Sequence, residues 1–247
     1  MSTRTQPGET RIAELAGAMA RIERRFGAHA VVRASAAERR AGERRTRTGT
    51  SLDRLTGGGL ATGSPYAFVG EGTCGKLTLA LRAVAAAQGE GGCAMWLDVP
   101  ASFDPLAAER AGVALDRLLV VRARTREDVL VAAGAALRSD GFRLVAVDAG
   151  APFGASLVPD DLAPLLPLVR SSTAALLVVA ERPPARLALP TFRFERVAWE
   201  RRHGRTLGWT FAASRAGQAE RAIFHVSSLG RTVTDVGLRT ELVEAAS

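Results

Sequence analysis

Lysine is almost absent from this sequence of 247 residues: Lys76 is its one lysine, and the other 32 of its 33 basic side chains are arginine. Cysteine is nearly as scarce, since the chain has two, Cys74 and Cys93, without metal-ligand spacing. This argues against a disulfide framework and predicts a reducing compartment. No apolar run reaches the roughly 18 residues of a membrane span, so no membrane partner is expected.

Two further features are missing. The first fifteen residues, MSTRTQPGETRIAEL, lack the apolar segment of a secretory leader, which predicts a cytoplasmic protein. His29, His203 and His225 have neither triad nor metal-ligand spacing. Hydrolase chemistry of the Ser-His-Asp or Cys-His kind therefore has no support, and the three histidines are interpreted as surface or packing residues.

Arginine and apolar residues are plentiful instead. Hydrophobic residues make up 47% of the chain, enough for the core of one large α/β domain. The formal net charge is +8 and the sequence pI is about 11.0. This balance favours an anionic partner such as nucleic acid, although arginines scattered over helix surfaces would give the same total.

The chain divides into three predicted parts. Residues 1–36 form an N-terminal arm, because apolar side chains recur at helical spacing over residues 9–27 and a short strand follows. Residues 37–50 are charged and poor in large apolar side chains, which predicts an Arg-rich linker. Residues 51–247 form the core domain.

Within the core, short apolar segments alternate with helical patterns. This alternation predicts an α/β fold with a mostly parallel central sheet and helices on both faces. After Pro190 the residue pattern changes to strand-like segments joined by short polar turns, which predicts antiparallel C-terminal strands. The predicted parallel strands are 66–70, 93–98, 118–122, 143–148 and 174–180, and the predicted helices are 76–88, about 105–112, 126–138 and about 159–170.

The stretch VGEGTCGKLTLAL, residues 69–81, has the pattern of a phosphate-binding loop. Gly70, Gly75 and Lys76 fit G-x-x-x-x-G-K-[ST] between a predicted strand and a predicted helix. Such a loop binds phosphate because backbone N–H groups and a helix N-terminus converge on its oxygens. A glycine-rich turn without a ligand is the alternative interpretation.

One position of this motif is unsuited to hydrolysis. Leu77 stands where a Ser or Thr hydroxyl would bind Mg²⁺. Thr78 follows, but it points about 100° away around the helix. Asp148 ends a predicted strand and could hold a Mg²⁺-bound water, although an Asp at a strand end is common in α/β folds. The residues argue against Mg²⁺ and leave two options, ATP bound without efficient hydrolysis or no nucleotide.

The predicted strands after Pro190 combine arginine with tryptophan. Aromatic side chains between arginines can stack on bases and bind phosphate, so Arg201, Arg202 and Arg205 are candidate contacts to single-stranded DNA. The alternative is structural: Phe192, Phe194, Trp199 and Trp209 would face the core, with solvated arginines opposite.

Four segments resemble RecA-type recombinases in order and spacing. Residues 51–81 resemble the entry into that family's P-loop, and residues 91–120 resemble the strand, nucleotide-contacting turn and helix that follow. Residues 18–35 are similar to the helix and strand by which one RecA subunit docks on its neighbour, and residues 219–247 resemble the end of the core. The resemblance implies a RecA-like P-loop fold.

The departures from that family fall on its ATPase machinery. The resemblance gives Pro100 the position of the catalytic Glu, and gives Glu181 the position of the Gln that senses the γ-phosphate. Asp104 matches a residue near the adenine, but Ala107 replaces the aromatic that stacks on the base. With Asp104 included, the expected nucleotide contacts are Gly70, Gly72, Thr73, Cys74, Gly75, Lys76, Leu77, Thr78, Asp104 and Asp148.

The losses resemble those of the ImuA-type accessory proteins of SOS mutagenesis. Both DNA-binding loops, residues 150–161 and 181–190, are shorter than the family's, and its separate C-terminal domain is not expected. This resemblance implies a protein of the bacterial nucleoid that is not an ATPase. It would contact RecA, or another copy of itself, through the arm, and would also contact a Y-family polymerase homologue. The alternative is a divergent DNA-dependent ATPase and recombinase on single-stranded DNA.

Overall fold

The computed structural model describes residues 44–89, 91–150, 157–227 and 233–240. The predicted arm lies outside the described residues. The described part of the predicted linker contains the strand β1 (Arg45–Thr46), which pairs antiparallel with β2 (Leu60–Ala61). Across the described segments, no helix is both long and apolar enough to cross a membrane.

The other elements follow the alternation predicted from the sequence. They are α3 (Leu52–Thr56), β3 (Pro65–Val69), α4 (Lys76–Gly89), β4 (Cys93–Asp98), α5 (Pro105–Arg110), the 3-10 helix η1 (Leu115–Arg117), β5 (Leu118–Val121), α6 (Arg126–Arg138), β6 (Phe142–Asp148), the 3-10 helix η2 (Pro159–Leu165), α7 (Leu166–Ser171), β7 (Ala175–Ala180), β8 (Thr191–Arg202), β9 (Arg205–Arg215), β10 (Glu220–Ser227) and β11 (Val233–Thr240).

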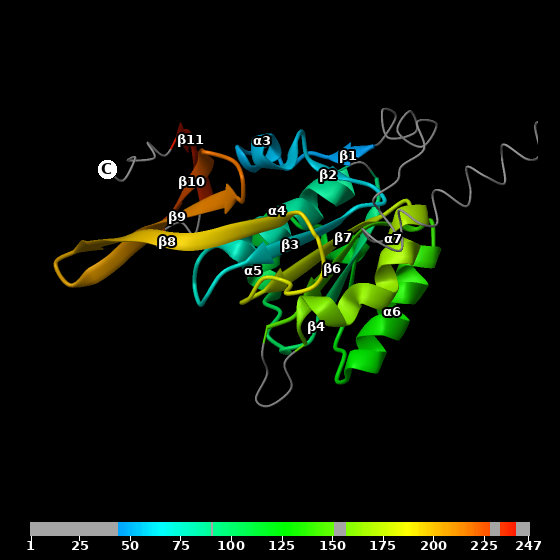
Figure 1. Ribbon diagram of the computed structural model, residues 1–247. Helices are drawn as coiled ribbons and strands as arrows, with labels where there is room; N and C mark the ends of the chain where they lie inside the picture. The colour runs from blue at the N-terminus through cyan, green and yellow to red at the C-terminus, as the bar shows by residue number, and fades with distance from the viewer. Residues whose placement is uncertain (1–43, 90, 151–156, 228–232, 241–247) are drawn as a thin grey trace, which may run out of the picture. The chain divides into compact units, whose positions relative to one another are not determined.

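One nine-stranded sheet, in the order β11-β10-β9-β8-β3-β7-β6-β4-β5, organises the described core. The strands from β8 to β5 in this order are parallel, and β8 to β11 are antiparallel. Strand β8 therefore belongs to both parts, because it pairs with β3 on one side and with β9 on the other. The predicted α/β, RecA-like architecture is confirmed (Figure 1).

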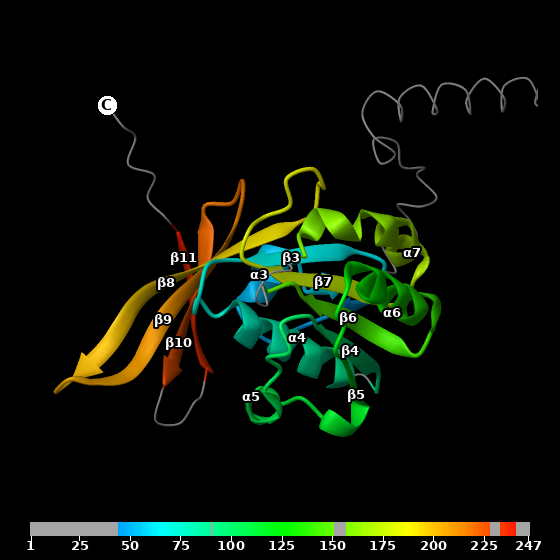
Figure 2. The ribbon, with the colours of Figure 1, turned by 90° about the horizontal axis from the view of Figure 1, so that it is seen from below.

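Apolar side chains project from both faces of the parallel strands. In β3, Tyr66 and Phe68 enter the cluster that packs beneath α4 and α5, whereas Ala67 and Val69 enter the cluster beneath α6 and α7. This two-residue alternation is the strand period, and it buries both faces of the parallel strands. Figure 2 shows the two helical layers on opposite sides of the sheet.

The short elements β1, α3, β2 and η1 were not predicted from the sequence, and two longer segments also depart from the predictions. The helix expected at about 159–170 is split into η2 and α7, because Pro164 and Pro167 cannot donate the backbone hydrogen bonds of a continuous α-helix. Strand β11 was not among the predicted strands. It is an edge strand that carries Gly237 at a φ of 101° and a register shift against β10, so its pattern is irregular.

Strands β8 and β9 form a long hairpin that extends beyond the helical layers (Figure 1). Arg202 pairs with Arg205, so the turn consists of His203 and Gly204. Their φ angles are 48° and 74°. Positive φ at both central residues is the type I′ arrangement, whose twist matches that of the strands.

Candidate nucleotide site

The P-loop segment joins β3 to α4 as the motif predicts. β3 ends at Val69 and α4 begins at Lys76, whose side chain is buried at 7% exposure. Its Nζ donates to the carbonyl oxygens of Gly70, at 2.6 Å, and Gly72, at 3.2 Å. The ammonium group is thus bound to two carbonyl oxygens of the loop, and the first amides of α4, which follow the loop, have no acceptor inside the helix.

Each glycine of this loop is required for its own reason. Gly72 has a φ of 55° with open space around it, so its need is conformational. A Cβ at Gly75 would lie 2.5 Å from the Phe211 ring, and one at Gly70 would lie 2.3 Å from the carbonyl oxygen of Phe194. Two of the three glycines are therefore needed for packing against β8 and β9, whether or not phosphate binds.

The first turn of α4 borders a small pocket of about 140 Å³. Leu77 lines this pocket and is 40% exposed. An isobutyl group there cannot bind Mg²⁺, so the site does not fit this ion, although the ammonium group and helix amides fit phosphate. The pocket is lined by Leu77, Thr78, Leu81, Trp96, Ser102, Phe103, Asp104, Ala107 and Asp148.

Two buried carboxylates lie at the far wall of the site. Asp98 ends β4 and Asp148 ends β6, and the two residues are partners in register. Burial raises the pKa of Asp148 to about 6; the amide of Gly150 opposes this shift, the charge of Asp98 adds to it and that of Lys76 reduces it. The sequence predicted Asp148 and missed Asp98.

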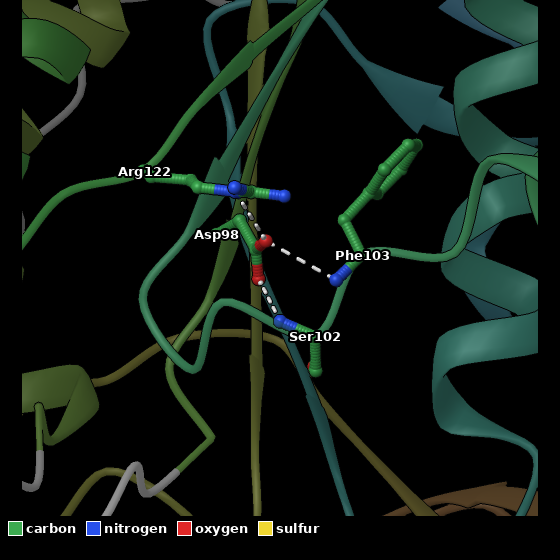
Figure 3. Close-up of polar contacts among 4 residues, drawn as sticks. All are labelled: Asp98, Ser102, Phe103 and Arg122. Carbon is green, nitrogen blue, oxygen red and sulfur yellow. Dashed lines mark hydrogen bonds and ion pairs between the residues drawn. The ribbon is translucent and has the colours of Figure 1, made fainter.

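Asp98 organises the loop that follows its strand. Its Oδ1 accepts from the amide of Ser102 at 2.9 Å, and its Oδ2 accepts from the amide of Phe103 at 3.1 Å. Figure 3 shows these two bonds and the Nε of Arg122, which lies 4.0 Å from Oδ2. The fully buried carboxylate thus fixes the loop that carries Pro100.

The residue that the resemblance equates with the catalytic Glu is held in this loop. The Cγ of Pro100 lies 3.6 Å from where a Cβ would stand on Gly150, which places the ring against the end of β6. Ala101 follows with a φ of 54°, a conformation that is strained for alanine. The backbone thus brings position 100 close to the end of β6, and the residue there carries no carboxylate.

Glu181 lies at a different cavity. This cavity, of about 300 Å³, is lined by Ala149, Leu157, Val158, Pro159, Ala180, Glu181 and Arg182. The short loop after β7 is held here by Asp160, whose carboxylate accepts from the amides of Ala185, Arg186 and Leu187 at 2.7 to 3.0 Å. These bonds, the one from Ala185 foremost, lower the pKa of Asp160.

Asp104 stabilises the first turn of the helix that follows it. It is the N-cap of α5, and its Oδ1 accepts from the amide of Leu106 at 2.9 Å. Ala107, one turn later, borders a larger pocket of about 440 Å³ together with Thr78, Arg110 and Trp209. The resemblance places an aromatic residue at position 107, where this chain has alanine. In the structure, the indole of Trp209, from β9, lines the same pocket as Ala107.

Two indole N–H groups beside these pockets lack a hydrogen-bond acceptor in the described structure. They are Nε1 of Trp96, a residue that lines the smaller pocket, and Nε1 of Trp209, a residue that lines the larger one; both nitrogen atoms are themselves buried. Buried donors of this kind are uncommon in proteins. Neither tryptophan was predicted to belong to the nucleotide site, because only the folding of β9 beside β10, and of β4 between β5 and β6, brings them there.

The aromatic and arginine side chains of the hairpin divide between buried and exposed positions. Phe192 and Phe194 are buried, as the structural reading predicted, whereas Trp199 is 42% exposed. Arg201, Arg202 and Arg205 lie at the exposed end of the hairpin. Arg196 lies closer to the core: its guanidinium is 4.6 Å from the ring centre of Trp199, and its Nη1 donates to the carbonyl oxygen of Thr73 at 3.3 Å.

Comparison with known proteins covers three of the four segments that resemble RecA in sequence; residues 219–247 lie outside the matched range of the family profile. The profile of the RecA N-terminal domain matches residues 13–162. Protein RecA of Synechocystis sp. is 37% identical over 145 residues, covering 59% of this chain and 40% of that protein. Protein RecA of Leifsonia xyli subsp. xyli is 37% identical over 146 residues (59% and 40%), and that of Acidiphilium cryptum 37% over 147 residues (59% and 42%). The chain thus matches about two fifths of the length of these relatives.

Proposed function

This chain belongs to the RecA family, and on that premise we propose that it is an accessory protein of DNA repair that retains the RecA-like core without the ATPase cycle. Its nearest functional parallel is the ImuA type of SOS translesion mutagenesis. In this role the protein acts through contacts with RecA and with an error-prone polymerase partner.

One observation carries the proposal: the two positions to which the resemblance gives the metal ligand and the general base both carry side chains that cannot act. Leu77 lines the pocket at the first turn of α4, and Pro100 packs at the end of β6. A missing general base alone costs on the order of 10²–10⁴ in rate. Loss of the metal ligand adds to this, so efficient turnover is not expected.

The exposed edge of the sheet supports the proposed protein contact. β5 is the outer strand of the parallel part of the sheet, and Leu119 on it is 49% exposed. A groove of about 590 Å³ runs beside it, lined by Phe103, Pro105, Leu115, Leu118, Val120 and Arg122. An open strand edge with apolar side chains is suited to receive an extended segment of another chain. We assign this edge to an arm of RecA or of a second copy.

Single-turnover hydrolysis of ATP by the full-length protein tests the proposal. Phosphate release should stay at the level of a Lys76→Ala variant, with and without single-stranded DNA. DNA-stimulated release that this variant lacks would overturn it. Deletion of residues 1–35 should abolish pull-down by RecA while the core remains folded; retained pull-down would remove the arm from the proposal.

A divergent, DNA-dependent ATPase and recombinase is the second candidate. Asp148 favours it, because this carboxylate ends β6 close enough to Lys76 for their charges to interact. The same hydrolysis experiment separates the two candidates, since the recombinase requires turnover that responds to single-stranded DNA.

A further inference from the structure

Arg196 joins the hairpin to the P-loop. β8 runs parallel to β3, with Arg193 in register with Val69, and then continues past the point where β3 ends and the loop begins. Three residues further along β8, the guanidinium of Arg196 reaches the carbonyl oxygen of Thr73, in the middle of the loop. Arg196 is therefore a second cation bound to a carbonyl oxygen of this loop, in addition to Lys76.

The position of this guanidinium is set by its own strand. The pairing of β8 with β9 shifts in register between Arg196 and Ala198, and such a bulge redirects the side chains around it. Trp199 then lies under the guanidinium at 4.6 Å, and Trp209 supports Trp199 from β9, with 5.9 Å between the ring centres. A cation over an indole face is attracted to it, which orders the side chain.

Most of the donors of Arg196 remain available to a ligand. A guanidinium has five N–H donors, and within the described residues the carbonyl oxygen of Thr73 is the hydrogen-bond acceptor recorded for them. The planar group can bind two oxygens of one phosphate through parallel N–H bonds, a fixed geometry that an ammonium group lacks. Glu71, also in the loop, is exposed and is the opposing charge of this segment.

From this arrangement, we infer that the P-loop binds a triphosphate without Mg²⁺, and that Arg196 supplies the counter-charge that the metal ion would otherwise provide. Leu77 removes the hydroxyl that would recruit the ion, so the negative charge must be met by protein cations. Lys76, Arg196 and the N-terminus of the fourteen-residue helix α4 supply them. This inference rests on the proposed absence of hydrolysis, because it concerns a ligand that is held and not consumed.

Two tryptophans line the pockets that adjoin the first turn of α4. Trp96 is 2% exposed, its Nε1 has no acceptor within the described residues, and it lines the pocket that Leu77 and Thr78 border. The larger neighbouring pocket shares Thr78, Leu81 and Ala107 with it and carries Trp209. A nucleoside attached to the phosphates would extend into these pockets, whereas inorganic triphosphate would leave them free.

Isothermal titration of the full-length protein with ATP and with inorganic tripolyphosphate, each in EDTA and in excess Mg²⁺, tests the inference. We expect binding whose Kd changes by less than about threefold when Mg²⁺ is removed. Arg196→Ala should raise the Kd about ten- to hundredfold, the range for hydrogen bonds to charged groups. Arg196→Lys keeps the charge but loses the planar guanidinium, so its Kd should lie between that of the unchanged protein and that of Arg196→Ala.

Arg193→Ala is the matched control, because it removes the same charge from an exposed position of the same strand. Tighter binding of ATP than of tripolyphosphate would identify a nucleotide as the ligand, and equal binding would identify polyphosphate. The inference is overturned if ATP and tripolyphosphate both fail to bind, if binding requires Mg²⁺, or if Arg196→Ala behaves like Arg193→Ala. The proposed function fails by a separate readout, DNA-stimulated phosphate release, so the two failures are distinguishable.

Discussion

Asp98 and Asp148 stand side by side at the carboxyl ends of β4 and β6, both buried and in register. Burial raises the pKa of Asp148 to about 6, and the neighbouring charge of Asp98 adds to this rise. The native state therefore holds a proton at Asp148 that the unfolded chain loses near the ordinary value of 3.8.

This relationship predicts how stability depends on pH. Because the folded pKa lies above the unfolded one, the contribution of Asp148 is most favourable below about pH 4 and is lost as the pH rises through 6. Asp148→Asn should raise the free energy of unfolding by about 2–3 kcal/mol at pH 8 and by little at pH 4. Urea unfolding at both pH values measures this difference. Asp116→Asn, at an exposed position, should show no such dependence, and a flat result for Asp148→Asn would contradict the shift.

The backbone conformation of Ala101 predicts that substitution of this residue by glycine stabilises the protein. Its φ of 54° is unfavourable for alanine, while glycine adopts it freely. Ala101→Gly should stabilise the fold by about 0.5–1 kcal/mol in spite of the greater freedom of glycine in the unfolded chain. Ala135→Gly, at an exposed position inside α6, should instead destabilise by about 1 kcal/mol. Thermal unfolding compares the two; equal losses would show that position 101 is not strained.

Asp160 predicts a local change in the loop after β7. Asp160→Asn removes a charge that accepts three amide hydrogens, so the amides of Ala185, Arg186 and Leu187 should exchange with solvent several-fold faster. Because the pKa of Asp160 is lowered, the native clamp persists above pH 4 and weakens as the pH falls below it. Hydrogen exchange read by NMR tests this. The control Asp161→Asn affects contacts to Arg126 and Val158 and should leave these amides unchanged.

Restoring the hydroxyl of the P-loop should not restore hydrolysis. Leu77→Thr supplies a ligand for Mg²⁺, but Pro100 still has no carboxylate to orient water, so phosphate release should remain at background. The background is set by the Lys76→Ala, Leu77→Thr double variant, which lacks the phosphate-binding ammonium. Turnover of Leu77→Thr clearly above that level would show that position 100 is dispensable.

The end of the hairpin predicts a salt-dependent contact with single-stranded DNA. Replacing Arg201 and Arg202 with Ala should weaken binding and reduce the slope of log K against log salt by about 1.4, since each phosphate contact contributes about 0.7 on single strands. Fluorescence anisotropy with a labelled oligonucleotide at several salt concentrations measures the slope. Arg124→Ala with Arg138→Ala removes the same charge around α6 and should leave the slope unchanged; equal slopes in both variants would assign the hairpin arginines to the fold.

Sequence reasoning reached the elements whose signal is local. β4 has the bounds predicted for it, and the position of Lys76 at the start of α4 follows from the motif alone. Asp148 was found because it ends an apolar run. These features depend on neighbours within a few residues, so periodicity and the P-loop pattern suffice to place them.

The remaining parts of the site depend on which strands lie side by side. Trp209 reaches the pocket beside Ala107, and Arg196 reaches Thr73, only because β8 and β9 fold back along β3. The role of Asp98 was hidden for a similar reason: an Asp at a strand end shows neither its partner across the sheet nor the two amides that it will accept.

The packing of Gly70 against Phe194 and of Gly75 against Phe211 bears on how this loop can change over evolutionary time. A substitution at either glycine collides with β8 or β9, so it damages folding before it can affect any ligand. Selection for a folded protein is then sufficient to preserve the glycine spacing, whether or not the loop takes part in hydrolysis. Leu77 is 40% exposed and meets no such barrier, so packing leaves this position free to vary while the two glycines remain.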